Sequence, residues 1–455
     1  MTSSIESPET PANSAIGTEN ADYDLAVEAV QFALPLYEMA RMRSATCPRV
    51  DHAGRYAGDS PETLKRWANE WFHTRVLLGP QHRRVVTPNN DTLYSSAWFD
   101  LSDGPLVIRV PAMNTRYYVL GLLDLYTNPF GYIGTRTTGN EAGAFFLHGP
   151  EWHGEVPAGM RAMACPTDTV WLIGRILVDG EADLAAGVHL QDQLTVEPAP
   201  GSAAQIPKLI DAGVQPTEML GNAERFAQVV NRLLADHPPP REAQAVVARF
   251  AACGIGAPCM DNVLDPAQRD ALERALAHVT HELAGEPPLA LGGGWALPVD
   301  VRATFGENYR ERAQVALCYI GALGIEEAMY ITADTDADGA TLDGNASYVL
   351  HFAPNNLPAV DAFWSLTAYE KATYMLAENV IGRYSLGDRT QGLEYDADGG
   401  LRIAISANMP SDPTLRRNWL PAPNDRFYLA LRLYVPRETH LARTFVYPPI
   451  ARQAA

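Results

Sequence analysis

The stretch FYLALRLYVP, residues 427–436, alternates between large apolar side chains and a second, more polar set. Successive side chains of a β-strand point to opposite faces, so Tyr428, Arg432 and Tyr434 share the face opposite the apolar one. This pattern predicts a strand that contributes one face to a hydrophobic core. The apolar face consists of Phe427, Leu429, Leu431, Leu433 and Val435.

Other segments of the chain carry the same β signature, and Gly, Pro, Asn and Asp clusters separate them. Such short runs are typical of mainly antiparallel sandwiches. Near the C-terminus they are SYVLHF (347–352) and LRIAIS (401–406). In the first half they are LVIRV (106–110), YYVLGLLDLY (117–126), AFFLH (144–148) and TVWLIGRILV (169–178).

Helical periodicity dominates the start and the middle of the chain, as in residues 25–43, 222–237 and 265–285. Pro35 is expected to kink or locally break the first of these helices. The sequence therefore predicts an α+β protein of mainly antiparallel β-sandwich domains with an inserted helical domain. The expected units are a disordered tail (1–22), an N-terminal helical segment (23–83), a β domain (84–197), a helical domain (198–325) and a second β domain (326–455).

Charge and cysteine content narrow the class of protein. The formal net charge is −19, from 54 acidic and 35 basic residues, so the surface repels nucleic-acid backbones and anionic lipid. Neither a nucleic-acid partner nor a membrane partner is expected. Five scattered cysteines do not resemble a disulfide framework, and no signal peptide or apolar run of membrane-spanning length is evident. We therefore expect a cytoplasmic protein that binds a small molecule and can form a homo-oligomer.

Two short motifs occur once in each β-rich region and in the same order. Pro-Asn-Asn followed after seven residues by Trp is found at 88–98 and again at 354–364. Gly-x-Arg-Thr-x-Gly is found at 134–139 and at 387–392. The matches indicate either a pair of related or convergent β units or a coincidence between short segments.

Longer strings resemble two known domain families. NNDTLYSSAWFDLSDGPLVIRVP, RYYVLGLLDLYTNPFGYIGTRTTG and GPEWHG are similar to the domain of unknown function 1254. VDAFWSLTAYE, NVIGRYSLGDRT, LEYDADGGLRI, NWLPAP and FYLALRLYVP are similar to its usual companion, the domain of unknown function 1214. The resemblance implies an immunoglobulin-like N-terminal β domain, an inserted helical domain and a jelly-roll-like C-terminal domain. It implies no settled activity.

The stretch TPNNDTLYSSAWFDL, residues 87–101, concentrates polar side chains before a strand. Asn89 and Asn90 are typical of a turn, because Asn side chains bond to nearby backbone and tolerate left-handed conformations; they can equally bind a substrate. Asp91 and Tyr94, together with Trp98, can line the mouth of a pocket. A buried Asp–Tyr pair is competent in proton transfer, so Asp91 and Tyr94 are candidate catalytic residues.

A second polar stretch follows the apolar strand near residue 120. Asp124 and Tyr126 are two residues apart and share a strand face, and Asn128 comes directly after them. Arg136 stands on a Gly-flanked loop, where it can bind a carboxylate or phosphate or form a structural bridge to an Asp. If the two stretches meet in space, Asp91, Tyr94, Asp124, Tyr126 and Arg136 form an acid–base site without a metal.

The C-terminal β region offers aromatic and guanidinium groups that suit a sugar or a flat organic ligand. The same residue types also build the core and corner hydrogen bonds of a sandwich. The candidate ligand-binding residues of this region are Trp364, Tyr369, Arg383, Tyr384, Arg389 and Trp419.

Metal and cofactor signals are weak. His148 and His153 are separated by a Gly-Pro turn, and His278 and His281 lack an evident third ligand. The segment 334–345 begins like a calcium loop but ends in Asn rather than Glu, so a hairpin is favoured over a calcium site. Nucleophile-elbow, P-loop and dinucleotide motifs are absent from the sequence. No metal and no cofactor are therefore expected.

Two functional hypotheses remain open. The first is a cofactor-independent enzyme that performs acid–base chemistry, as a hydrolase, lyase or isomerase, on a small molecule in a cleft formed by the β domains. The second is a non-enzymatic protein that binds a carbohydrate or a hydrophobic small molecule.

Overall fold

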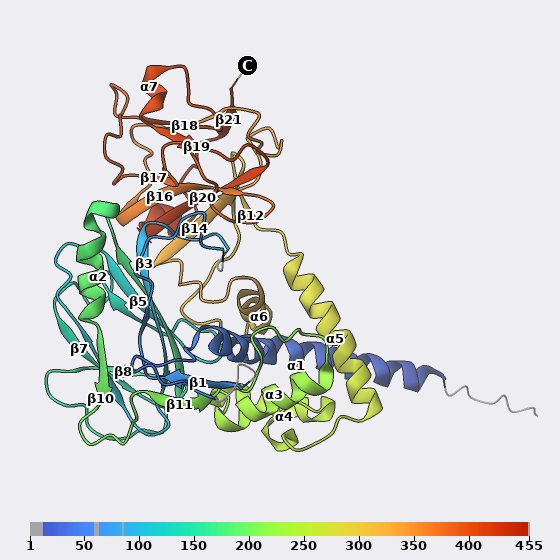
Figure 1. The fold of residues 1–455 in the computed structure, drawn as a ribbon. Helices are drawn as coiled ribbons and strands as arrows, with labels where there is room; N and C mark the ends of the chain where they lie inside the picture. Colours follow the sequence, from blue (N-terminus) through green and yellow to red (C-terminus); the bar gives the residue numbers. More distant parts are fainter. Residues whose placement is uncertain (1–11, 59–62, 84–85, 454–455) are drawn as a thin grey trace, which may run out of the picture.

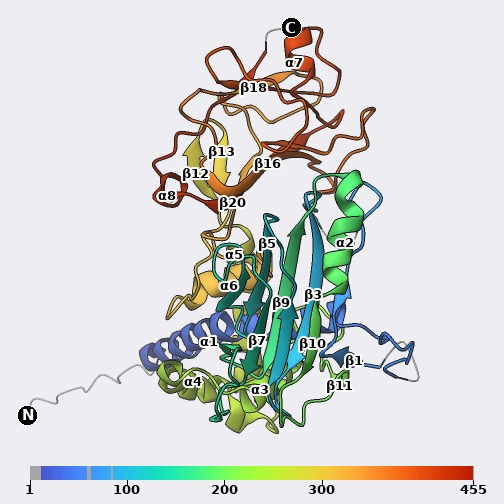
Figure 2. The same ribbon diagram turned by 90° about the vertical axis from the view of Figure 1, so that its left-hand side faces the viewer.

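The computed structural model describes residues 12–58, 63–83 and 86–453, and it confirms the expected α+β class with mainly antiparallel, sandwich-like β domains. The C-terminal β domain lies above the N-terminal one, and the helices pack to one side of the N-terminal domain (Figure 1). In the view turned by 90°, the central strands of the N-terminal domain point with one end toward the C-terminal domain (Figure 2).

The N-terminal β domain consists of two sheets around one apolar core. The first sheet has the order β2-β3-β9-β5-β6 and is antiparallel throughout. Its strands are β2 (Phe72–His73), β3 (Thr92–Asp100), β5 (Tyr118–Leu123), β6 (Gly131–Gly134) and β9 (Thr169–Leu177). The second sheet is β10-β4-β7-β8, formed by β4 (Leu106–Val110), β7 (Gly143–His148), β8 (Arg161–Ala164) and β10 (Thr195–Pro198). Helix α2 (Leu184–Asp192) packs beside β3 and β9.

The C-terminal β domain also has two sheets with a shared core. The larger sheet, β12-β13-β14-β20-β16-β17, is built from β12 (Leu289–Gly292), β13 (Trp295–Leu297), β14 (Ala328–Ala333), β16 (Val360–Glu370), β17 (Ser385–Gly387) and β20 (Phe427–Pro436). The smaller sheet, β19-β18-β15-β21, is built from β15 (Tyr348–Phe352), β18 (Leu401–Ser406), β19 (Trp419–Pro421) and β21 (Ile450–Arg452). Short helices α7 (Pro413–Arg416) and α8 (Glu438–Leu441) complete it.

Strand β20 confirms the predicted alternation and adds to it. Its odd-numbered residues from Phe427 to Leu433 lie in the sandwich core. Tyr428, Arg432 and Tyr434 on the other face are also buried, because the loop before β3 and the start of β5 cover that face. The polar face of the strand is therefore an interface between the two β domains.

The helical core joins the first helix to the middle of the chain. It comprises α1 (Ala12–Thr46), α3 (Ala223–Asp236), α4 (Gln244–Arg249), α5 (Pro266–Ala284) and α6 (Tyr309–Cys318). Asp265 and Gln268 form a capping box at the start of α5, which ends at Ala284 before Gly285, as the sequence predicts. No helix among the described residues is long and apolar enough to span a membrane.

Three predictions about the N-terminal part of the chain need correction. Residues 1–11 of the expected tail lie outside the described residues, and α1 already begins at Ala12. The helix also continues through the buried Pro35 without a break, because its packing on α5 and α6 outweighs the lost hydrogen bond. The expected helical segment 23–83 is helical only to Thr46, since β1 (Lys65–Ala68) pairs with β11 (Lys208–Asp211) and β2 joins a sheet.

The expected helical domain is interrupted by two strands before its last helix, α6. Strands β12 and β13 lie within residues 198–325, but they form a hairpin that belongs to the C-terminal sheet. Gly292, Gly293 and Gly294 make its turn with positive φ angles. Backbone of this kind favours glycine, which accounts for the three consecutive glycines at this turn.

Candidate functional site

The loop before β3 attaches the N-terminal β domain to the polar face of the C-terminal sheet. The backbone oxygen of Thr87 accepts a hydrogen bond from Arg432 (2.9 Å), and that of Pro88 accepts one from the Tyr369 hydroxyl (2.7 Å). Asn89 donates to the Tyr434 hydroxyl through its amide nitrogen. These polar groups therefore do more than form a turn, because they hold two domains together.

Asp91 is buried in this interface and fully engaged. Its carboxylate accepts hydrogen bonds from Ser365 Oγ (2.6 Å) and Ser385 Oγ (3.3 Å). Arg389 lies 3.3 Å from the same carboxylate and also pairs with Asp179. The Asp91 backbone N–H donates to Asn89 Oδ1 at 2.6 Å, which forms the predicted Asx turn. Asp91 thus anchors the interface. Its carboxylate oxygens are already occupied by two serines and an arginine, which disfavours a role as a general base.

Arg175 lies beside Tyr94 at the same end of the sheet, and these two residues are register partners on β9 and β3. Its guanidinium is 5.5 Å from the centre of the Tyr94 ring. Arg175 is only 6% exposed, and its Nε and Nη1 atoms are buried without a hydrogen-bond partner among the described residues. A buried cation costs several kcal/mol unless an anion compensates it. The protein therefore offers an unpaired guanidinium at the domain interface.

Tyrosines surround Arg175. Burial lowers the pKa of Arg175, but Tyr330, Tyr94, Tyr434 and Tyr117 raise it more, so the guanidinium stays charged. Burial also raises the pKa of Tyr434 and of Tyr117 well above the ordinary value. A neutral phenol donates one hydrogen bond, and because the Tyr434 hydroxyl accepts from Asn89, its own proton can stabilise an anion beside Arg175.

A second buried arginine, Arg432, lies across the interface. It donates to Thr367 Oγ1 (3.1 Å) and to Tyr369 (2.6 Å) in addition to the Thr87 backbone, while its Nε atom has no partner among the described residues. Burial raises the pKa of Tyr369 to about 12 even though Arg432 lowers it. The interface therefore contains two buried guanidinium groups within a set of neutral hydroxyls.

The two matching Gly-x-Arg-Thr-x-Gly loops are both at this interface, and each gives its arginine to the opposite domain. Arg136 of the N-terminal loop pairs with Glu327 at 2.7 Å, and Arg389 of the C-terminal loop pairs with Asp91. Glu327 also accepts a hydrogen bond from Tyr117 at 2.8 Å. The bridge predicted for Arg136 thus exists, but its partner is a glutamate of the C-terminal domain.

The first glycine of each loop is required for the same reason. A Cβ atom on Gly134 would lie 2.6 Å from the backbone oxygen of Tyr118, and one on Gly387 would lie 2.1 Å from that of Trp364. Both glycines belong to edge strands that run very close to their neighbours. The strands next to the two edge strands are not equivalent. Strand β17 pairs with β16, which carries Trp364 of the other repeated motif, whereas β6 pairs with β5 and not with β3, which carries Trp98. The repeated motif is therefore local and does not extend to the same strand arrangement.

Asp124, Tyr126 and Asn128 lie at the opposite end of the sheet. Strands β3 and β5 are both antiparallel to β9, so they run in the same direction. Asp91 precedes β3 whereas Asp124 follows β5, which separates them by about six residues of strand, or roughly 20 Å. The five predicted catalytic residues therefore do not form one site.

At that opposite end, Asp124 accepts hydrogen bonds from the backbone of Tyr126 (2.9 Å) and from the Asn128 backbone and side chain (2.9 Å each). The Tyr126 hydroxyl donates to the His237 backbone oxygen at 2.8 Å. Burial raises the pKa of Asp124, and the guanidinium of nearby Arg312 lowers it. These contacts join the sheet to the helical core.

The remaining predicted ligand-binding residues are mostly structural. Trp98 stacks on Trp171 with ring centres 5.1 Å apart, and Trp364 lies in the C-terminal core. Trp419 is buried and donates to the Ser406 backbone, and Arg383 donates to the Trp419 backbone. Tyr384 packs against the Tyr369–Tyr428 cluster, and the Oδ1 atom of Asn90 is buried without a partner among the described residues.

Sequence reasoning missed Arg175 as a candidate and left Arg432 as one member of a strand face. Both are single arginines within apolar runs, WLIGRILV and LALRLYV, where a charge is costly unless it is compensated. That mismatch was the available signal. Tyr117, Tyr330 and Glu327 carried no comparable signal, because their importance depends on how the domains meet.

Metal-ligand candidates are dispersed in the structure. Among residues 12–58, 63–83 and 86–453, no three His, Cys, Asp or Glu side chains are grouped so that they could hold a metal ion. His148 packs on Trp152, and His278 pairs with Glu282. The calcium-like segment contains an isolated bridge between Thr335 and Thr341, as expected for a hairpin. All five cysteines are free thiols.

Comparison with known proteins places the two β domains in families. Residues 68–198 match the family described as protein of unknown function (DUF1254), and residues 327–438 match the one described as protein of unknown function (DUF1214). No curated protein matches the chain.

Two solved structures match the chain, with different degrees of similarity. The VPA0106 protein from Vibrio parahaemolyticus is 25% identical, with a TM-score of 0.72, over 95% of this chain and 100% of that one. An uncharacterized protein from Burkholderia cenocepacia is 13% identical, with a TM-score of 0.40, over 98% of this chain and 91% of that one. The matched regions show that the chain belongs to the two-domain family that joins a DUF1254 region to a DUF1214 region and whose function is unknown.

Proposed function

We propose that the protein binds a small organic anion between its two β domains, with Arg175 as the residue that holds the anion. The observation that carries this proposal is the buried guanidinium of Arg175, two of whose nitrogens have no hydrogen-bond partner in the part of the chain that the structure describes. The four side chains with the largest effect on the pKa of Arg175 are all tyrosines, and none of them is a carboxylate. A carboxylate or similar anion supplies the missing charge.

The surrounding groups suit this ligand class. Tyr94 presents its ring to the guanidinium and is only partly buried, as is Tyr330 on the opposite domain. Neutral tyrosine hydroxyls donate to anionic oxygens, whereas the acidic groups nearby are already paired with Arg389 and Arg136. The ligand therefore meets hydrogen-bond donors rather than free carboxylates.

Mass spectrometry of the purified protein tests this proposal. We expect an organic acid to be released on denaturation of the wild type and to be missing from Arg175→Met. Arg109→Met is the matched control, because Arg109 lies on the second sheet in an exposed pair with Glu197. Added carboxylates, from acetate to adipate, extend the test by calorimetry. Equal binding by all three proteins, or no binding by the wild type, would refute the proposal.

A second candidate function is acid–base catalysis on the bound anion, as in an isomerase or a lyase. It is favoured by Tyr434, whose burial keeps the phenol protonated next to Arg175 and Arg432. A protonated phenol beside two guanidinium groups can stabilise an oxyanion as it forms. Asp91 positions the interface in this proposal and does not act as the base.

Deuterium exchange separates catalysis from binding. If the protein is an enzyme of this kind, the released acid should incorporate deuterium from D2O in the presence of the wild type and not of Tyr434→Phe. Binding without any exchange would leave the protein as a binding protein. The comparison is valid only for variants that retain the wild-type affinity for the acid, which calorimetry measures.

A further inference from the structure

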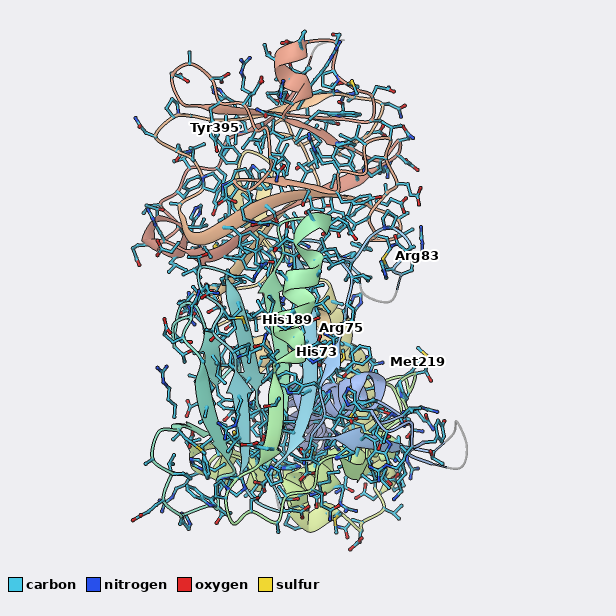
Figure 3. The ribbon with its side chains drawn as sticks, turned by 60° about the vertical axis from the view of Figure 1, so that its left-hand side comes forward. His73, Arg75, Arg83, His189, Met219 and Tyr395 are labelled. Carbon is cyan, nitrogen blue, oxygen red and sulfur yellow. The ribbon has the colours of Figure 1, made fainter. Side chains whose placement is uncertain are left out.

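A surface hollow follows the edge strand β2, on the flank of the N-terminal β domain. Two adjoining cavities of about 350 and 330 Å³ share His52, Glu70, Trp71, His73 and Arg75. Their sizes are at the lower end of the range for small-molecule sites. Figure 3 shows His73 and Arg75 together on this flank, below the C-terminal domain. The hollow is therefore separate from the interface around Arg175.

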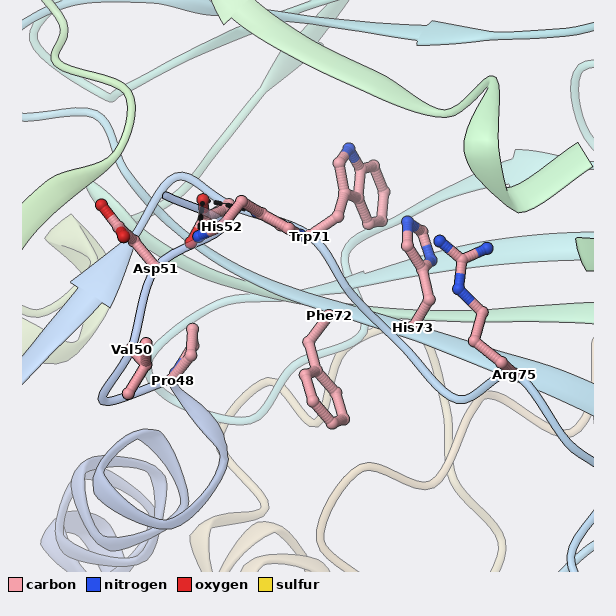
Figure 4. A pocket seen from close by; sticks show the side chains of 9 residues that line it. Pro48, Val50, Asp51, His52, Trp71, Phe72, His73 and Arg75 are labelled. Carbon is pink, nitrogen blue, oxygen red and sulfur yellow. Dashed lines mark hydrogen bonds and ion pairs between the residues drawn. The ribbon is translucent and has the colours of Figure 1, made fainter. Parts of the chain in front are cut away.

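Strand alternation arranges the wall of the hollow. Trp71, His73 and Arg75 are two residues apart and lie on the same side of the extended segment, while Phe72 points the other way (Figure 4). The Trp71 and His73 rings are nearly parallel, with centres 5.8 Å apart. Phe72 and Val50 are exposed at the rim. The hollow thus combines flat aromatic surface with hydrogen-bonding groups.

Hydrogen bonds determine the tautomer of His73. Gln191 Nε2 lies near the backbone oxygens of Thr74 (3.3 Å) and Tyr94 (2.9 Å), which can only accept, so this atom is the amide nitrogen. It donates to Ser95 Oγ at 3.1 Å. The remaining partner of Ser95 Oγ among the described residues is His73 Nδ1, 2.8 Å away. The Ser95 hydroxyl therefore donates a hydrogen bond to His73 Nδ1.

The proton of His73 is therefore on Nε2, which has no acceptor among residues 12–58, 63–83 and 86–453. Burial and, to a smaller extent, the charge of the neighbouring Arg75 lower the pKa of His73 to about 4, so the imidazole is uncharged at neutral pH. The Trp71 indole N–H is also buried without a partner within the same described ranges. The hollow consequently offers neutral N–H donors.

Charges along the hollow disfavour an anion. Asp51, Glu70 and Asp192 are the lining carboxylates, and Arg75 is the one permanently charged cation among the residues that line the two cavities. Each carboxylate is already paired: Asp51 with Arg55, Glu70 with His52 and Asp192 with Arg75. These carboxylates would repel an anionic ligand, whereas they would not repel a neutral hydrogen-bond acceptor.

We infer that this hollow binds a small, planar, uncharged molecule whose carbonyl or ring acceptor accepts a hydrogen bond from His73 Nε2–H. The flat body of the ligand contacts Trp71, which lies on the same side of the segment as His73. The ligand chemistry is the opposite of that proposed for the domain interface, so the two sites differ in the charge of what they bind.

Ligand-observed NMR with benzamide as the probe tests this inference, because benzamide is flat and neutral and carries a carbonyl acceptor. Wild type should bind benzamide more tightly than benzoate. His73→Phe should lose about fivefold or more in affinity, as expected when one neutral hydrogen bond is removed. His153→Phe is the control, since His153 is exposed on another loop.

Nitrogen-15 NMR of the His73 ring checks the hydrogen-bond argument independently of any ligand. At pH 7 the ring should show a protonated Nε2 and an unprotonated Nδ1. An imidazolium, or a proton on Nδ1, would overturn the inference. So would the absence of benzamide binding at millimolar concentrations, tighter binding of benzoate, or equal affinity in His73→Phe and wild type.

Discussion

The two ends of the sheet β2-β3-β9-β5-β6 each bury an arginine, and they satisfy it differently. At the helical end, the Arg312 guanidinium lies 4.8 Å from the Phe32 ring centre, 5.2 Å from Tyr309 and 5.5 Å from Tyr126. It donates to the Phe32 backbone at 3.1 Å. At the end that faces the C-terminal domain, the Arg175 guanidinium lies near one aromatic ring, and two of its nitrogens, against one for Arg312, have no partner among the described residues.

This difference separates a structural charge from a charge that is available to a ligand. Arg312 has rings on several sides and the Asp124 carboxylate near it. Arg175 has neutral phenols near it and no carboxylate among its strongest neighbours. Burial alone does not distinguish the two arginines, because both are almost inaccessible to solvent. Their partners do.

The largest expected effect is on stability at the helical end. Arg312→Met should lower the free energy of unfolding by about 3 kcal/mol, because it removes cation–π contacts and leaves Asp124 without a nearby cation. Arg175→Met should not lower it, since the substitution removes a buried charge that has no anionic partner among the described residues. Urea unfolding of both variants provides the measurement. Equal losses would end the distinction between the two arginines.

Acid should weaken the helical end next. Burial lowers the pKa of His237 to about 4, whereas an unfolded histidine titrates near 6.5. The unfolded state then binds the proton first, so stability falls as the pH drops from about 6.5 to 4, by up to about 3 kcal/mol. In His237→Asn this part of the fall should disappear.

Urea unfolding at pH 7 and at pH 4.5 measures that difference. His153→Asn should retain the full pH dependence of the wild type, because His153 is exposed. An unchanged pH dependence in His237→Asn would mean that the burial of the His237 ring does not account for the loss of stability in acid.

The domain interface should respond through its two arginine–carboxylate pairs. Glu327→Gln should cost about 2 kcal/mol, because Glu327 is 1% exposed and accepts from both Arg136 and Tyr117. Asp91→Asn should cost about 1 kcal/mol, since Ser365 can still donate to an amide oxygen and Arg389 keeps Asp179.

Double-mutant cycles resolve the two pairs more sharply. The coupling energy of Glu327 with Arg136 should exceed that of Asp91 with Arg389, because Arg389 divides its guanidinium between two carboxylates. A larger coupling for Asp91 would reverse the order of the two pairs and identify Asp91 as the stronger anchor of the interface.

The smallest effect is expected for Tyr126→Phe. It removes one hydrogen bond to the His237 backbone and should cost about 1 kcal/mol in the free energy of unfolding. Tyr126 lies at the end of the sheet away from Arg175, so binding of the organic acid should be unchanged by calorimetry. Loss of that binding would place the ligand at the helical end instead.

The fold was largely accessible from the sequence, because alternation and helical periodicity are local. The two faces of residues 427–436 are an example, since period two alone separates Leu431 from Arg432. Asp91 was also identifiable, as a polar residue at a strand start. The position of Asp124 was not, because it depends on β3 and β5 running in the same direction on either side of β9.

The unpaired state of Arg175 was inaccessible for a different reason. Whether a buried guanidinium has a partner depends on the domain that closes over it, and the groups involved are up to about 260 positions away in the chain, as Tyr434 is. Local patterns cannot report such a contact. They indicate only that a charged residue lies within an apolar run of the sequence.

Strand β20 also limits how far the two matched regions can act as separate modules. Its odd residues complete the C-terminal core, but its even residues have their partners in the loop before β3 and at the start of β5. A fragment confined to residues 327–438 would expose Tyr428, Arg432 and Tyr434 to water. Exchange of this region between family members would therefore preserve the interface only if residues 86–91 and Tyr117 were exchanged with it.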